Sequence, residues 1–85
     1  MSDSHFQIAV LDRGFVYVGH VSAADGWIKI EGARCVRRWG TTRGLGQLAA
    51  EGPQEATKLD PAGTVRAPLS SVVHLIDADP TKWAA

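Results

Sequence analysis

The chain has 85 residues, and nine basic and nine acidic side chains give it a formal net charge of zero. A chain of this length makes one domain that buries only about 60–65% of the surface its unfolded form exposes, so self-association would help a thin core. Its single cysteine excludes an intramolecular disulfide, and no apolar run approaches the ~20 residues of a membrane-spanning helix. We therefore expect a cytoplasmic, homo-oligomeric protein with no membrane partner.

Polar residues 1–5 predict a disordered tail, and residues 6–85 a single β-rich domain. Phe6–Leu11 and Phe15–Val21 are apolar runs of strand length, joined by the turn residues 12–14. A glycine inside a β-branched run indicates a bend, so Gly19 predicts that the second strand curls the sheet.

Asp25-Gly26 is a strong signal for a tight hairpin. The strand after it alternates, with Ile28 and Ile30 facing the core. Beyond Gly32 the chain is expected to continue extended to Trp39, with Val36 and Arg38 on one face and Cys35, Arg37 and Trp39 on the other.

A short helix is predicted over residues 45–51, capped by Thr41 or Thr42 and ended by Gly52 and Pro53. Two glycines, Gly44 and Gly46, lie at its start. Each costs roughly 0.5–1 kcal/mol relative to Ala in a helix. Their presence suggests that the backbone approaches another group closely.

The remaining chain predicts a weak strand over residues 54–59, a type I turn at Asp60–Gly63, and a returning strand at Thr64–Ala67. A final strand is expected over residues 71–76, and Asp79-Pro80 should begin a C-terminal helical turn anchored by Trp83.

These elements predict a mainly β protein with six to seven short strands, one short inserted helix and a C-terminal helical turn. The nearest architectures are a small curved antiparallel sheet or an SH3- or Sm-like barrel. An open sheet with the helix packed on one face is the alternative.

Positive charge is concentrated between residues 32 and 50, which hold four arginines and no acid. Guanidinium groups, hydroxyls and the free amides of a glycine-rich loop are the groups that bind phosphate, and a ring could stack on a tryptophan beside an arginine. The candidate ligand-binding residues are Arg37, Arg38, Trp39, Thr41, Thr42, Arg43, Gly44 and Gly46. The alternative is that the glycines only form turns, Trp39 is core, and the arginines pair with Glu51, Asp77 or Asp79.

Metal binding and catalysis are not expected. His5, His20, His74 and Cys35 lack the close spacing of structural zinc ligands, and no cofactor motif is present. Cys35 with His20 or His74 is the one nucleophile–base pairing available, and a buried structural thiol is the favoured interpretation.

The aromatic residues Phe15, Tyr17 and Trp27 are expected to be core rather than an exposed patch. Trp27, which follows the hairpin turn, is the one of them most suited to the surface.

Three segments, Arg37–Ala49, Arg13–Gly19 and Leu59–Val65, resemble small uncharacterised proteins encoded by tailed bacteriophages and prophages. The Arg-Trp-Gly-Thr-Thr element at residues 38–42 is the most specific part of this resemblance. It implies a setting, the cytoplasm of an infected bacterium, and it carries over no mechanism and no functional residues.

Taken together, these patterns predict a small non-enzymatic binding protein. Its loop from Arg37 to Gly46 would engage an anionic ligand, namely a nucleotide, a nucleic acid or an acidic protein surface. The alternative is a structural or assembly module in which the same segment joins two proteins and no small ligand exists.

Overall fold

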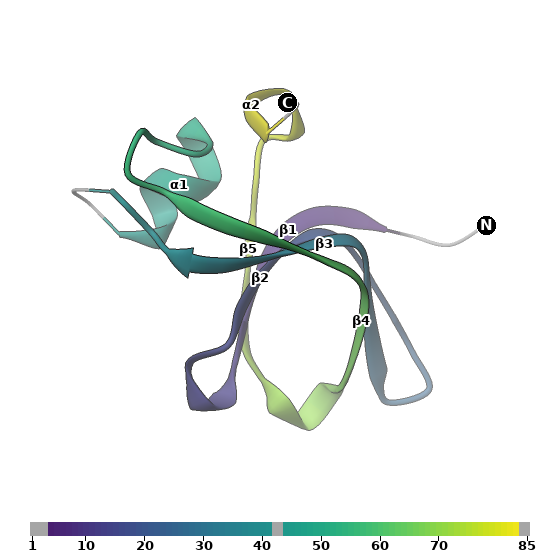
Figure 1. Cartoon of the computed structure of the whole chain (residues 1–85). Coiled ribbons are helices and arrows are strands. Elements are labelled where there is room, and N and C mark those ends of the chain that lie inside the picture. The colour runs from purple at the N-terminus through teal and green to yellow at the C-terminus, as the bar shows by residue number, and fades with distance from the viewer. Residues whose placement is uncertain (1–3, 42–43, 84–85) are drawn as a thin grey trace.

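A computed structural model describes residues 4–41 and 44–83. The chain forms one antiparallel sheet of five strands in the order β4-β3-β2-β1-β5, with two short helices (Figure 1). The elements in chain order are β1 (His5–Leu11), the 3-10 turn η1 (Asp12–Gly14), β2 (Val16–Ala24), β3 (Trp27–Arg38), α1 (Leu45–Glu51), β4 (Lys58–Pro68), the 3-10 turn η2 (Leu69–Ser71), β5 (Val72–Asp77) and α2 (Pro80–Trp83).

The mainly β class is confirmed, but the third hairpin predicted at Asp60–Gly63 is wrong. Those residues lie inside the continuous strand β4, opposite β3, where Arg34 faces Pro61 and Ala33 faces Gly63. The register shifts on both sides of Ala33. Proline and glycine are tolerated at bulges of an edge strand as well as in turns. The two strands expected here are therefore one, and the sheet has five strands with β4 and β5 as its open edges.

The first two hairpins form where the sequence predicts them. β1 and β2 meet through η1, where the amide of Leu11 donates to the carbonyl oxygen of Phe15 at 2.8 Å. β2 and β3 meet through the two-residue turn Asp25-Gly26. β1 begins at His5, the last residue of the expected tail, which pairs with Val21.

The bend predicted at Gly19 is confirmed. The β2–β3 register shifts between Val18 and His20. A Cβ on Gly19 would lie 2.8 Å from Cγ2 of Ile30 and 2.9 Å from the carbonyl oxygen of Glu31. Only glycine allows β3 to approach β2 this closely, and the sheet curls at this point.

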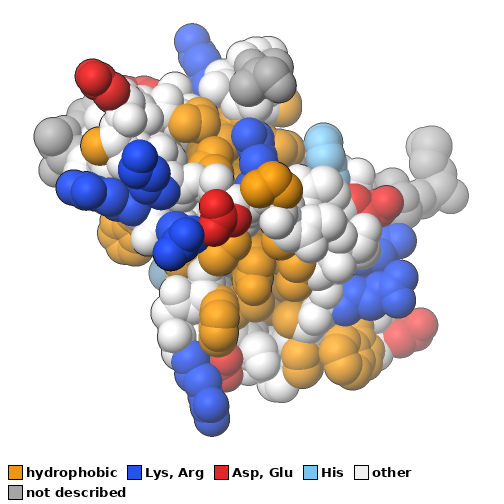
Figure 2. Space-filling view, in the orientation of Figure 1, with side chains coloured by type: hydrophobic (Ala, Val, Ile, Leu, Met, Phe, Trp, Pro, Cys, Tyr) orange, Lys and Arg blue, Asp and Glu red, His pale blue; other side chains and the backbone are white. Residues whose placement is uncertain are grey.

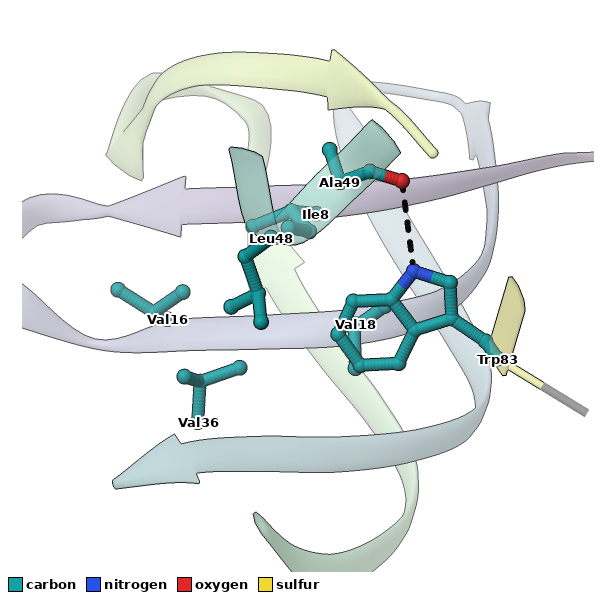
Figure 3. Close-up of a cluster of buried hydrophobic side chains, with 7 residues drawn as sticks. All are labelled: Ile8, Val16, Val18, Val36, Leu48, Ala49 and Trp83. Carbon is teal, nitrogen blue, oxygen red and sulfur yellow. Dashed lines mark hydrogen bonds between the residues drawn. The ribbon is translucent and has the colours of Figure 1, made fainter. Parts of the chain in front are cut away.

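Both faces of the sheet bury apolar side chains. On one face Leu48 and Ala49 of α1 and Trp83 of α2 cover Ile8, Val16, Val18 and Val36 (Figure 3). The second cluster consists of Ala9, Leu11, Val21, Ile28, Ile30, Ala33 and Ala67. The helices thus cover the first face, and the second cluster is built from residues of β1, β2, β3 and β4.

Both helices lie where they are predicted. Gly52 ends α1 with a positive φ of 82°, and its amide donates to the carbonyl oxygen of Leu48 at 2.9 Å. Asp79 caps α2, because its Oδ1 accepts the amide of Thr81 at 3.0 Å. The anchor Trp83 is 3% exposed. No helix in the described ranges has the length and hydropathy needed to cross a membrane.

Two expectations about side chains are corrected. Thr41 does not cap α1: Gly44 holds the N-cap position without a side-chain hydrogen bond, and the Thr41 hydroxyl donates to the Gly44 carbonyl oxygen at 2.9 Å. Phe15 is not core but exposed, because it lies at the turn that leads into β2. Trp27 is exposed as well, which agrees with its place at a hairpin end.

Candidate functional site

A bulge at the end of β3 brings consecutive arginines to one place. Val36 pairs with Leu59 and Arg38 pairs with Lys58, so Arg37 is an extra residue with no position opposite it on β4. Strict alternation would put Arg37 and Arg38 on opposite faces, as expected from the sequence. Since a bulge redirects side chains locally, both arginines line the same hollow.

The hollow is shallow, open to solvent, and has a volume of about 380 Å³. Figure 2 shows basic side chains gathered at the left of the molecule, where β3 ends and β4 begins. The lining residues are Arg37, Arg38, Lys58, Leu59 and Asp60. Three cations thus surround the hollow with one carboxylate, which makes it electropositive.

Arg38 and Lys58 face each other directly across the two strands. Like charges at directly opposed positions of a sheet destabilise it. Within the part of the chain that the structure describes, neither side chain has a hydrogen bond or an ion pair to an acid. An anion placed between them would relieve this repulsion.

Arg37 forms an ion pair with Asp60, with Nη1 3.2 Å from Oδ2. The two side chains are 68% and 56% exposed. An exposed ion pair contributes only about 0–1 kcal/mol, so an incoming anion can compete for the guanidinium.

Asp60 is not among the acids expected to neutralise the arginines. Two of those acids have other partners: Asp77 accepts a hydrogen bond from Gln7 at 2.8 Å, and Asp79 accepts from Thr81. Asp60 takes this role because β4 runs beside β3, a pairing that the predicted hairpin does not contain.

Trp39 follows Arg38 in the chain and is 43% exposed. Its backbone is held tightly, because the Thr57 hydroxyl donates to the Trp39 carbonyl oxygen at 2.6 Å and accepts from the Gln54 amide at 2.8 Å. Gly40 packs so closely on the peptide between Ala56 and Thr57 that a Cβ would overlap it. An exposed aromatic ring therefore stands on a fixed backbone next to Arg38.

The other residues of the predicted loop contribute less to the described site. Thr41 is engaged by Gly44, and Gly46 lies exposed in the first turn of α1. Nothing lies within 4 Å of a Cβ built on Gly44 or Gly46, so the close approach inferred for these glycines is found at Gly40 instead. Thr42 and Arg43 lie outside the described residues.

Arg34 has a structural role. Its guanidinium carbon lies 5.5 Å from the ring centroid of Trp83, and Nη2 donates to the Trp83 carbonyl oxygen at 3.3 Å. It therefore stabilises the docking of α2.

Lys58 and Asp60 are the charged lining residues that sequence reasoning missed. Lys58 lies in the segment predicted as a weak strand, and Asp60 was assigned to a turn. Their place beside Arg37 and Arg38 depends on the β3–β4 register. The signal available in the sequence was that Leu59 is an apolar residue flanked by two charged ones, the alternation of a half-buried strand.

Cys35 is partly buried, and its cross-strand neighbours are Tyr17 and Asp60 rather than a histidine. In the described ranges, no three His, Cys, Asp or Glu side chains are grouped to hold a metal ion. The chemistry gathered in the hollow at the β3–β4 end is thus that of three cations and one carboxylate.

A scan against protein-family models and searches of curated proteins and solved structures found no match for this chain.

Proposed function

We propose that the protein is a small non-enzymatic binding protein that takes an anionic ligand in the hollow between the ends of β3 and β4. The observation that carries this proposal is the direct opposition of Arg38 and Lys58, neither of which forms an ion pair with an acid among the described residues. Such an arrangement costs stability in the free protein. A bound anion turns the same pair into a favourable interaction.

A phosphate group fits this site best. Guanidinium groups donate to two phosphate oxygens at once, and the lysine adds a compact point charge. The exposed ring of Trp39 is available for stacking by a base. The ligand class is therefore a nucleotide or a nucleic-acid strand, with Arg37 released from Asp60 when the ligand binds.

Binding rather than catalysis is supported by the groups in the hollow. The guanidinium and ammonium groups there neutralise negative charge, and the Asp60 carboxylate is engaged by Arg37. The proposed setting of this binding is the cytoplasm of an infected bacterium, which the resemblance to phage-encoded proteins implies. For the architecture, an SH3- or Sm-like barrel is supported by η2, which leads directly from one edge strand to the other.

A titration with inorganic tripolyphosphate, ATP and a short oligothymidine tests the proposal. Binding is followed by amide chemical shifts and calorimetry at low and high salt. We expect affinity that falls as salt rises, with shifts at Arg37, Arg38 and Lys58. Arg38→Ala and Lys58→Ala should each weaken binding by about 10–100-fold, since a hydrogen bond to a charged group contributes about 1.5–3 kcal/mol.

Arg66→Ala is the matched control, because Arg66 is an exposed cation at the far end of β4. Its affinity should stay within about twofold of the wild type. Absence of binding, or binding that does not depend on salt, would refute the phosphate site. Equal losses of affinity in Arg38→Ala, Lys58→Ala and Arg66→Ala would refute it as well.

The alternative function, a structural or assembly module, is favoured by a second feature. Trp27 and Leu69 are 53% and 48% exposed and lie close together, because Trp27 pairs with Pro68 and the Leu69 amide donates to the Gly26 carbonyl oxygen. An apolar patch of this kind suits contact with another protein. If none of the three probes binds, the module interpretation is preferred.

A further inference from the structure

The two edges of the sheet differ in how they are protected. An edge strand presents unpaired backbone groups, and natural proteins blunt such edges with prolines, bulges and charged side chains. β4 is blunted in all three ways. Pro61 and Pro68 lack an amide hydrogen, the β3–β4 register shifts three times, and Lys58 and Arg66 place charges along the strand.

β5 has one of these devices, a bulge at Val73, where the register with β1 shifts between Val72 and His74. It lacks the prolines and the charged side chains in its central part. Residues 72–76 read Val-Val-His-Leu-Ile, without a proline, glycine or acidic residue and without Lys or Arg. They are the kinds of residue that fit a pleated strand. β5 pairs with β1 along one side, and its other side is the free edge of the sheet.

Apolar side chains are also exposed along this edge. Val73 is 60% exposed and Leu75 is 39% exposed, and Leu69 in the preceding turn is 48% exposed. These are three of the six large hydrophobic side chains that are exposed in the described chain. An uncharged, apolar strand at a sheet edge is a template for pairing with another strand.

We propose that β5 pairs antiparallel with β5 of a second copy of this chain, which forms a two-fold dimer with one continuous sheet. The charge pattern favours a second copy: since residues 72–76 carry no Lys, Arg, Asp or Glu, two identical strands can lie side by side without like-charge repulsion. The two-fold pairing also limits the assembly to two copies, because the only sheet edge left in each copy is the blunted β4 edge. The dimer is independent of the phosphate site, which lies at the opposite edge.

Sedimentation velocity of the full chain over a range of concentrations tests this proposal. We expect a concentration-dependent dimer in the wild type. Val73→Lys and Leu75→Lys should raise the dimer dissociation constant by at least about tenfold, because each substitution occurs twice in a two-fold interface. Thr64→Lys is the control: it adds the same charge to the exposed β4 edge and should leave the dimer unchanged.

Hydrogen exchange locates the interface. In the dimer, amides of residues 72–76 that face outward in the monomer should become protected, and dilution should remove this protection. Circular dichroism confirms that each variant is folded. A wild type that stays monomeric at high concentration, or a dimer that survives both β5 substitutions, would overturn the proposal, as would protection along β4 instead of β5.

Discussion

The hydroxyl of Thr57 donates a 2.6 Å hydrogen bond to the carbonyl oxygen of Trp39 and so ties the segment before β4 to the end of β3. The next residue, Gly40, has a φ of 68° and lies against the peptide between Ala56 and Thr57. This contact fixes the chain where Arg38 and Trp39 are presented. The loop therefore needs a glycine at position 40 for packing within its own chain.

We predict that Gly40→Ala lowers the free energy of unfolding by about 2–5 kcal/mol. About 1–2 kcal/mol comes from the left-handed backbone conformation and the rest from overlap of the new Cβ with the Ala56–Thr57 peptide. Gly32→Ala is the control, because Gly32 has a similar φ of 60° but open space around it. Gly32→Ala should lose only the part of the stability, about 1–2 kcal/mol, that comes from the backbone conformation. Urea denaturation measures both, and equal losses would show that the contact does not matter.

Local signals in the sequence are sufficient to predict several of the turns and helix ends. Asp25-Gly26, Gly52 and Asp79-Pro80 each mark a turn or a helix end through the conformation of the residues themselves. Such signals depend on neighbours in the chain, so the first two hairpins and both helices lie where they are predicted.

Features that depend on distant pairing were not predictable. The residues Asp60–Gly63 suit a turn and a bulged edge strand equally well, and the choice is made by contact with β3. The same pairing decides that Lys58 joins the arginines. The sequence therefore indicated two arginines that line the hollow, Arg37 and Arg38, but not the strand that completes it.

The opposition of Arg38 and Lys58 predicts an unusual stability effect. Arg38→Glu should raise the free energy of unfolding by about 0.2–1 kcal/mol, because a repulsive cross-strand pair becomes an attractive one. The same change should abolish binding of tripolyphosphate. A gain in stability combined with a loss of binding is typical of a residue kept for its ligand.

Salt provides the check on this prediction. The rise in the free energy of unfolding of Arg38→Glu should shrink in 1 M NaCl, because charges at the surface are then screened within about 3 Å. Arg38→Gln removes the repulsion without adding attraction and should lie between the wild type and the glutamate variant. If Arg38→Glu is less stable than the wild type at low salt, the side chains of Arg38 and Lys58 do not repel each other.

The N-cap of α2 predicts a pH effect. Hydrogen bonds from the hydroxyl and the amide of Thr81 lower the pKa of Asp79 below its ordinary value of 3.8. Because the folded pKa lies below the unfolded one, the ionised carboxylate stabilises the fold above pH 3.8, and this contribution is lost as the pH falls through the folded pKa.

Carboxyl carbon NMR of Asp79 measures this directly. Its titration midpoint should lie below 3.8 in the wild type and move up toward 3.8 in Thr81→Val. This substitution removes the hydroxyl hydrogen bond, which has the largest effect on the pKa, and keeps the amide hydrogen bond. An unchanged midpoint in Thr81→Val would show that the hydroxyl does not cap the helix in solution.

Trp83 anchors α2 over the core, and its removal should be the most damaging tryptophan substitution. The indole is 3% exposed, contacts the ring of Phe6 at a centroid distance of 6.0 Å, and lies under the guanidinium of Arg34. We expect Trp83→Ala to cost about 3–5 kcal/mol. Trp83→Phe should cost less, because it keeps most of the packing and loses only the long 3.5 Å hydrogen bond to the Ala49 carbonyl oxygen.

Trp27→Ala is the matched control, since Trp27 is 53% exposed and its loss should change stability by less than about 1 kcal/mol. Urea denaturation followed by circular dichroism gives the free energies of unfolding. Amide exchange in α2 and at Ala49 should rise in Trp83→Ala, because the helix is no longer held on the sheet. If Trp83→Ala and Trp27→Ala cost the same, α2 does not dock in solution, and the first face of the sheet must be covered by α1 alone.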